Sequence, residues 1–317
     1  MTFDQFELVQ LSKSAYALVN SEDDSVSGGF GSNQGILLLE SSVLVFDTGL
    51  TTGQASALKR AIASLTSNPV RYVINSHDHS DHVFGNHAFV TGEKKSQTMI
   101  LAHEICRQNM ASKAQRKLEM YRKTQSGQLF EGLHEIPLPN LTYLDNSLRM
   151  RLEGMEIYLV HPPTGAHTLG DTLMVLPSEG VLFAGDTVWN GFFPNLEDAN
   201  LEGWIAFLSD LDLGACRVCL PGHGKVCSPD QVREFRDYLA EVRRRIMLLE
   251  ITKSEERKKE PEGGTNQLLL QQQEEECFAH AGTTDGWKLR QTIDSNVRAL
   301  LEIPTVYEDS PPRSRRS

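Results

Sequence analysis

The sequence has few cysteines, no long apolar run and no excess of positive charge. Its five cysteines are an odd number, which does not suggest a framework of disulfide bonds. The formal net charge of -11 argues against nucleic acid as a partner, because phosphates need a basic surface. No apolar run approaches transmembrane length, so no membrane association is expected. At 317 residues, with 39% hydrophobic and 23% charged residues, the composition is that of a soluble globular protein.

Several well-known functional motifs are also missing. The first residues lack the basic and apolar segments of a signal peptide, which predicts a cytoplasmic protein. No Gly-x-Ser-x-Gly elbow is found, so a serine triad is not expected. The glycine-rich segment 26–33 lacks both the Gly-Lys-Ser/Thr ending of a P-loop and the spacing of a dinucleotide fingerprint. We therefore expect a structural turn there, which could still line a functional site.

What the sequence does contain is a dense polar motif at residues 76–82. The β-type run 70–75 precedes it, so a strand should end by delivering Ser-His-Asp-His-Ser-Asp-His to a loop. His77 and His79 are two residues apart and point the same way in extended backbone. Asp81 and His82 follow once the chain has begun to turn. Imidazole and carboxylate groups suit zinc and similar divalent metals.

Further ligand types follow three later strand-like segments. Residues 155–160 precede a loop with His167, residues 180–184 precede Asp186, and residues 217–220 precede His223. Side chains delivered in this way by several strands can converge on a common rim and be held by rigid elements.

This pattern resembles the ligand set of the metallo-β-lactamase superfamily of metallohydrolases. The resemblance covers roughly the first three quarters of the chain and includes residues 43–49, a strand ending in Asp-Thr-Gly. It implies an α/β fold, the αββα sandwich of two mixed β-sheets flanked by helices.

The resemblance also implies a dinuclear centre with two divalent metal ions. One ion would be held by His77, His79 and His167. The other would be held by Asp81, His82 and His223. Asp186 would bridge the two ions, and Asp47 would brace the ligand loops. Zinc is the expected metal, and iron or manganese accepts similar ligands.

The expected chemistry is hydrolysis of a small molecule. Two divalent ions roughly 3.5–4 Å apart can lower the pKa of a shared water towards about 7 and so supply hydroxide. That hydroxide would attack a carbonyl-type centre in an ester, thioester, lactone or lactam. Asp81 is the expected catalytic residue, because it could orient the nucleophile or handle a proton. The sequence is compatible with a homo-oligomer.

Two alternatives stay open for the same ligand set. One is an iron-dependent redox enzyme, as in the persulfide dioxygenases or the flavodiiron proteins of the same superfamily. Flavodiiron sites usually have glutamate where His79 stands, which counts against them. The other is a phosphodiesterase or nuclease, which the acidic charge disfavours. Asp186 occupies a position where the best-known clinical zinc β-lactamases carry cysteine, which argues against β-lactam hydrolysis as the main activity.

Other metal-binding side chains have simpler interpretations. Cys216, Cys219 and Cys227 lie near His223 but flank an apolar strand, so buried thiols are expected rather than a zinc knuckle. Five histidines lack companion ligands and should be structural or surface residues: His87, His103, His134, His161 and His280.

Three polar residues near the motifs need separate expectations. His161 ends the strand before His167 and could lie near the rim. Asp78 is in the motif at a position that the family pattern leaves open, so it is not expected to be a ligand. Asp171 could brace the loop of His167.

The expected domains are a catalytic domain at 1–250, a helical extension at 251–308 and a disordered tail at 309–317. Helices are predicted at 52–65, 104–124, 201–208 and 229–250, from apolar periodicity and from Ser228-Pro229 as a helix start. A charged loop is predicted at 252–264, followed by helical segments at 267–276 and 285–302.

Overall fold

The computed structural model describes residues 2–3, 6–20, 31–90, 98–124 and 126–259. The chain divides into two compact units: the larger holds residues 1–194 and 199–243, and the smaller holds residues 195–198 and 244–317. The predicted helical segments at 267–276 and 285–302 and the predicted tail lie outside the described residues. The predicted domain boundaries therefore stay a prediction.

The first sheet has eight strands that lie in chain order. The strands up to β5 pair antiparallel, whereas β5, β6, β7 and β8 pair parallel. Their bounds are β1 Thr2–Phe3, β2 Phe6–Gln10, β3 Ala15–Asn20, β4 Gln34–Leu38, β5 Val43–Phe46, β6 Val70–Ile74, β7 Met99–His103 and β8 Leu141–Tyr143.

The second sheet has five strands in the order β13-β12-β11-β10-β9. Its strands pair antiparallel except β12 and β13, which are parallel. Their bounds are β9 Ser147–Leu152, β10 Met155–Val160, β11 Leu173–Leu176, β12 Val181–Asn190 and β13 Val218–Gly224. Both sheets are therefore mixed, as predicted.

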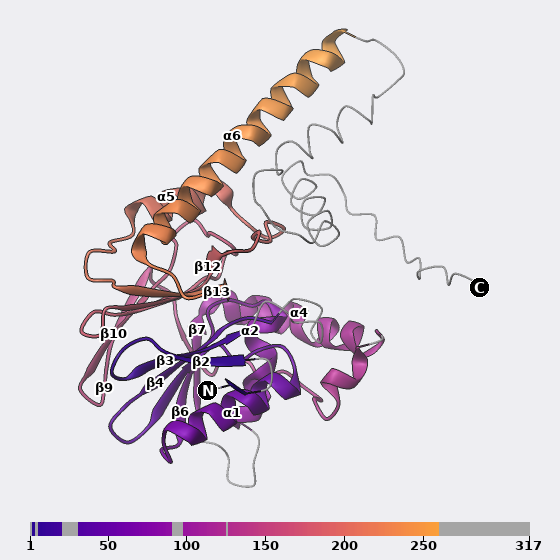
Figure 1. The fold of residues 1–317 in the computed structure, drawn as a ribbon. Helices are drawn as coiled ribbons and strands as arrows, with labels where there is room; N and C mark the ends of the chain where they lie inside the picture. The colour runs from indigo at the N-terminus through magenta and orange to yellow at the C-terminus, as the bar shows by residue number, and fades with distance from the viewer. Residues whose placement is uncertain (1, 4–5, 21–30, 91–97, 125, 260–317) are drawn as a thin grey trace. The chain divides into compact units, whose positions relative to one another are not determined.

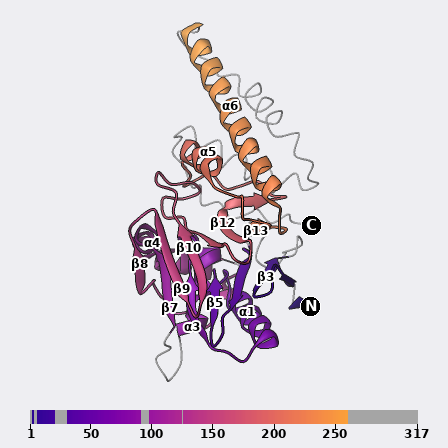
Figure 2. The ribbon, with the colours of Figure 1, turned by 90° about the vertical axis from the view of Figure 1, so that its left-hand side faces the viewer.

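The two sheets lie face to face (Figures 1 and 2), and a cluster of buried apolar side chains from both fills the space between them. The rings of Phe46 on β5 and Phe183 on β12 meet there with centroids 5.7 Å apart. Leu44 of the first sheet and Leu159 of the second belong to the same buried cluster. Burial of apolar surface is the main favourable contribution to such packing.

Helices cover the outer faces and complete the αββα sandwich (Figure 1). On the first sheet, Leu58 and Ile62 of α1 pack in one cluster with Val45 of β5. On the second sheet, Trp204 of α5 is buried and its ring lies 5.7 Å from that of Phe235 in α6. The helix bounds are α1 Thr52–Leu65, α2 Ser80–Val83, α3 His87–Val90, α4 Glu104–Arg122, α5 Leu201–Asp210 and α6 Pro229–Lys259, with short 3-10 turns η1 Phe84–Asn86 and η2 Gly127–Phe130.

The start of α1 is fixed by a capping box. The Thr51 side chain accepts from the Gln54 backbone N–H at 3.1 Å, and the Gln54 side chain accepts in return from the Thr51 N–H at 3.2 Å. This box confirms the predicted beginning of the helix. It also fixes the chain directly after the Asp47-Thr48-Gly49 turn, which contacts the histidine motif.

Two predicted boundaries are wrong. Asp186 and His223 do not follow their strands but lie within them, because β12 continues to Asn190 and β13 to Gly224. The pairing of β12 with β13 shifts register around Gly185, so the strand bends at the site and then resumes. The glycines and polar residues that suggested loops are part of this irregular ladder.

The end of α6 also differs from the sequence prediction. A loop was expected from residue 252, but the helix continues to Lys259. Residues 251–259 are mostly lysine, glutamate and arginine, which favour helix, and the first breaker is Pro261. Among the described residues, no helix is long and apolar enough to cross a membrane.

We predict that Gly85→Ala destabilises the protein by about 3 kcal/mol, the upper end for overpacking. A Cβ on Gly85 would lie 2.0 Å from the Thr48 carbonyl oxygen, where the turn after β5 meets the motif. Urea unfolding measures the change. The matched control is Gly53→Ala in α1, where a Cβ meets only ordinary contacts and should stabilise by up to about 1 kcal/mol. Equal stability of the two variants would contradict the close approach at Gly85.

Candidate metal centre

The site begins with Asp47, directly after β5. Its backbone φ of 60° is in the left-handed region, which aspartate tolerates better than most residues. Its carboxylate accepts from the Ser76 N–H at 2.7 Å and from the Ser76 hydroxyl at 2.6 Å, and it lies 2.7 Å from His82 Nδ1. This last contact orients the ring, so that His82 Nε2 faces Asp81 and Asp186.

The first of two ligand groups is made of His77, His79, His167 and Asp186, whose nearest donor atoms all lie within 4.8 Å of one another. Nε2 of His167 lies 2.9 Å from His79 Nδ1 and 3.2 Å from Asp186 Oδ2. Nε2 of His77 lies 3.8 Å from the same Asp186 oxygen. Three rings and one carboxylate oxygen therefore face a common point.

The second group is made of Asp81, His82 and His223, within the same distance limit. Oδ2 of Asp81 lies 3.1 Å from His223 Nε2 and 3.4 Å from His82 Nε2. The other oxygen of Asp186, Oδ1, lies 3.0 Å from His82 Nε2 and 3.4 Å from His223 Nε2. One carboxylate thus contacts both groups, with a different oxygen for each.

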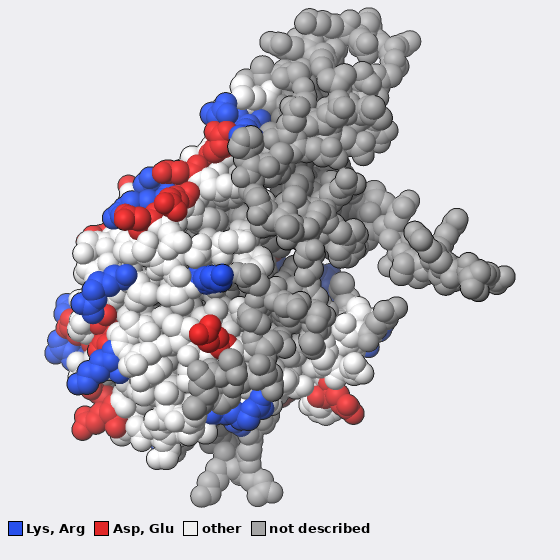
Figure 3. Space-filling model, in the orientation of Figure 1, with Lys and Arg blue, Asp and Glu red and all other residues white. Residues whose placement is uncertain are grey.

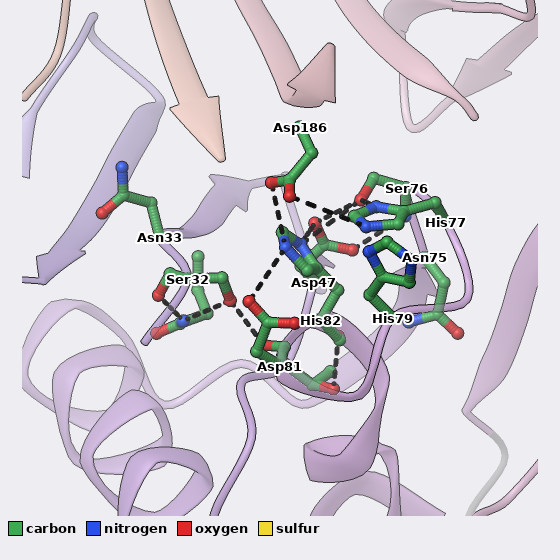
Figure 4. Close-up of polar contacts among 12 residues, drawn as sticks. Ser32, Asn33, Asp47, Asn75, Ser76, His77, His79, Asp81, His82 and Asp186 are labelled. Carbon is green, nitrogen blue, oxygen red and sulfur yellow. Dashed lines mark hydrogen bonds and ion pairs between the residues drawn. The ribbon is translucent and has the colours of Figure 1, made fainter. Parts of the chain in front are cut away.

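Figure 4 shows how the two sheets contribute to the site: Asp186 points down from β12 towards His77, in the loop after β6, and His82, in the following helix α2. Gly222 on the adjacent β13 leaves room for this carboxylate, because a Cβ there would lie 1.9 Å from Asp186 Oδ1. Glycine is required at this position by close approach.

The donor set fits a pair of divalent ions. In a tetrahedral zinc site with bonds of about 2.0–2.1 Å, neighbouring ligand atoms are about 3.4 Å apart, close to the 2.9–3.8 Å spacings of both groups. His77 Nε2, His167 Nδ1 and Asp186 Oδ1 are buried and make no hydrogen bond of good geometry. Buried polar atoms rarely lack a hydrogen bond. Two of these three, His77 Nε2 and Asp186 Oδ1, face the ligand cluster.

Two imidazoles of the first group, those of His77 and His167, are in the neutral form that binds metal. Burial lowers the pKa of His77 well below its ordinary value, and the nearby His82 and His79 add to this effect. Burial likewise lowers the pKa of His167 to about 3. Both rings are therefore neutral at pH 7, as a metal ligand must be.

The second group is more strongly charged. Burial opposes a charge on His82, but Asp186, Asp81 and Asp47 together raise its pKa well above the ordinary value. For His223, burial again opposes the charge, and Asp186 and Asp81 raise the pKa to about 9. The same pairs hold the pKa values of Asp81 and Asp186 well below the ordinary range, against the effect of burial. Both carboxylates are ionised at neutral pH, and a metal ion that bound here would displace the protons of the two imidazoles.

One side of the site is open. His79 and Asp81 are half-buried, whereas the other ligands are buried. Trp189, also half-buried, stacks on His223 with ring centroids 4.2 Å apart, and its Nε1–H donates to the Asp186 carbonyl. Trp189 has no motif around it, and the sequence prediction missed it.

Two further predictions, for Asp171 and Asp78, are confirmed. Asp171 does brace the loop of His167, because its carboxylate accepts from the N–H and the hydroxyl of Thr168. Asp78 points away from the site and contacts Asn109 and Lys113 of α4.

The histidines and cysteines outside the two groups are structural or exposed in the described residues. His161 stacks on His103 at 3.7 Å, and its Nδ1 contacts the Asp171 carbonyl. Burial lowers the pKa values of both rings, which join neither ligand group. Cys219 and Cys227 are buried and Cys216 is half-buried, all as free thiols with raised pKa values at Cys216 and Cys219. His280 lies outside the described residues.

Comparison with known proteins identifies the family. The profile of the metallo-beta-lactamase superfamily matches residues 27–223, which contain all seven proposed ligands. This chain belongs to the metallo-beta-lactamase superfamily.

Two solved structures share the superfamily fold. A metallo-beta-lactamase from Pontibacter korlensis is 18% identical, with a TM-score of 0.59, and the match covers 74% of this chain and 99% of that one. The structure of VMB-1 is 17% identical, with a TM-score of 0.56, and the match covers 76% and 98% of the two chains. At such identities the likeness shows the fold alone.

Two curated proteins match the sequence. The alpha subunit of 2,4-dinitroanisole O-demethylase from Nocardioides sp. (strain JS1661) is 30% identical over 52% of this chain. Linear primary-alkylsulfatase from Pseudomonas sp. (strain ATCC 19151) is 23% identical over 63% of this chain. Each match covers 44% of the relative, so this chain spans less than half of either.

We predict that Asp47→Asn weakens zinc binding by about 10–100-fold, the usual effect of losing a group that orients a ligand. Asparagine keeps the shape and tolerates the left-handed backbone, but it lacks the second acceptor oxygen and the charge that hold Ser76 and His82. Competition with a chromophoric chelator measures the affinity. The exposed Asp145→Asn serves as control. An unchanged affinity in Asp47→Asn would remove this residue from the centre.

Proposed function

We propose that this protein is a hydrolase that depends on two divalent metal ions, zinc by preference, and acts on a small molecule. The bond cleaved is at a carbonyl-type centre, in an ester, thioester, lactone or lactam. The proposed ligands are His77, His79, His167 and Asp186 for one ion and Asp81, His82, His223 and Asp186 for the other.

The observation that carries the proposal is the placement of Asp186. Its two oxygens face two separate clusters of imidazoles, at 3.2 Å on one side and 3.0 Å on the other. A structural ion pair would need one partner for this carboxylate, whereas a carboxylate that joins two ligand sets suits two cations. Nitrogen and oxygen donors together match zinc, iron or manganese.

A bound pair of divalent ions would supply Lewis acidity and a water molecule of lowered pKa at neutral pH. The chain's own contribution is to hold the reacting groups in place. Asp81 is ionised and half-buried on the open side, so its carboxylate can accept a hydrogen bond from a water molecule and orient it. Trp189 stands beside both groups and offers an apolar surface for the organic part of a substrate.

The two curated relatives favour a second candidate. One is named an O-demethylase acting on 2,4-dinitroanisole, and the other is named an alkylsulfatase. An aryl ether or a sulfate ester would place a different electrophile over the same ligands. This candidate keeps the proposed metal centre and changes only the bond that is cleaved.

A phosphodiesterase or nuclease is less well supported. The net charge is -11, and on the face in Figure 3 the described lysine and arginine side chains lie among acidic ones. A continuous basic surface is what a nucleic acid would need. We further propose a cytoplasmic location, since the four described cysteines are free thiols, which suits a reducing compartment.

We predict that Asp186→Asn lowers kcat/KM by more than about 100-fold. Losing a metal ligand should reduce activity more than losing a residue that only orients a ligand, which typically costs about 10–100-fold. The matched control is Asp78→Asn, a buried aspartate in the histidine motif that contacts α4 instead. Its activity should stay within a few-fold of the wild type. Equal activities in the two variants would contradict the bridging role of Asp186.

We predict that chelation abolishes hydrolysis and that zinc restores it. Metal analysis of the purified protein should give about two divalent ions per chain, as the two groups of ligands imply. A chromogenic panel of ester, thioester, lactone, lactam, sulfate ester, aryl ether and phosphodiester then identifies the bond. Stoichiometric iron with oxygen consumption would replace the hydrolase by a redox enzyme, and turnover of the phosphodiester alone would replace it by a phosphodiesterase.

A further inference from the structure

The two residues before β4, Ser32 and Asn33, touch the segments that carry Asp81, in α2, and His223, in β13. Both side chains are buried, and both lie beside the ligand cluster in Figure 4. We call them the Ser32–Asn33 clamp. Neither belongs to the ligand set, and their partners are distant in the sequence.

Asn33 makes four hydrogen bonds. Its Nδ2 donates to the Pro221 carbonyl at 2.9 Å and to the Gly224 carbonyl at 2.8 Å. Its own N–H donates to the Gly222 carbonyl at 2.7 Å. Its Oδ1 accepts from the Asn20 N–H at 2.9 Å, which ties the amide to the end of β3.

These contacts hold the backbone on both sides of His223. Three of the four go to carbonyls of residues 221–224, so the segment that bears the imidazole is held at three points by a single side chain and its backbone. The same segment includes Gly222, which lies against Asp186. A shift of this segment would therefore move His223 and Gly222 together.

Ser32 contacts the segment that carries Asp81. Its hydroxyl donates to the Asp81 carbonyl at 2.5 Å, and the side chain of Gln34 donates to the Ser32 carbonyl. The clamp therefore contacts the backbone of Asp81 and the backbone on both sides of His223. The third, His82, is oriented separately by Asp47.

We propose that the Ser32–Asn33 clamp positions the ligands of the second metal ion and that Asn33 determines whether that ion is held. The inference rests on the metal centre of the proposed function. Asn33 is a positioning residue, because it acts through the backbone that carries His223 and does not itself face the ligand cluster.

The clamp acts on one group only. In the part of the chain that the structure describes, the side-chain hydrogen bonds of Ser32 and Asn33 reach no residue of the loops that carry His77, His79 and His167. Those loops have their own supports, Ser76 beside His77 and Asp171 beneath Thr168. Loss of the clamp should therefore empty the second position and leave the first filled.

The test is zinc binding by purified Asn33→Ala and Asn33→Asp at buffered free zinc. Wild type should hold two ions, and both variants should bind the second ion about 10–100-fold more weakly while the first is unchanged. Aspartate has the shape of asparagine but no Nδ2 donor, so it leaves the Pro221 and Gly224 carbonyls facing a carboxylate. It should therefore be no better than alanine, whereas a residue that only fills space would be rescued by aspartate.

The matched control is Asn140→Asp. Asn140 also bridges chain segments, accepting from the Ile100 N–H and donating to the Thr98 carbonyl, but at the start of β7, away from the carboxyl ends that bear the ligands. It should keep both ions. Two ions bound with unchanged affinity in Asn33→Asp would overturn the clamp alone, and a wild type that binds no divalent metal would overturn the proposed function first.

Discussion

The buried carboxylate of Asp186 is the group on which the two halves of this molecule converge. It comes from the second sheet, and two of its four imidazole partners, His77 and His82, come from the segment after β6 in the first. A buried charge is costly unless it is paired. Here the compensating imidazoles are themselves held by other polar groups, such as Asp47 behind His82. The charge of Asp186 therefore stays paired only while the two sheets keep their positions relative to each other.

The parallel strand pairs explain why the site lies where it does. β5 and β6 are parallel neighbours, so Asp47 and Ser76 leave the sheet at the same edge and meet at 2.7 Å. β12 and β13 repeat this in the second sheet and bring His223 beside Asp186. The antiparallel strands lie outward from these pairs. Carboxyl ends of neighbouring parallel strands form a common rim, and two such rims face each other across the apolar core.

Features that depend on neighbouring residues could be predicted from the sequence, whereas features that depend on distant residues could not. The residues of the histidine motif could be named because their chemistry and spacing are contained in seven positions. The capping box of α1 is equally local. Strand ends around Asp186 and His223 were misplaced, because a bulged strand with glycine has the composition of a loop. Asn33 carries no local signal at all, since its partners lie 188 and 191 residues away.

The supports and the open side of the centre have different consequences for function. Behind the ligands stand Asp47, Asn33 and Asp171, which are buried and bonded to fixed partners. On the open side stand the half-buried His79, Asp81 and Trp189. In the proposed centre, the buried supports would fix which ions the ligands can hold, whereas the partly exposed side chains would meet the substrate. A fold and its ligand set do not by themselves decide the substrate, so substrate choice at the proposed centre would depend on side chains that hold no metal, such as Trp189.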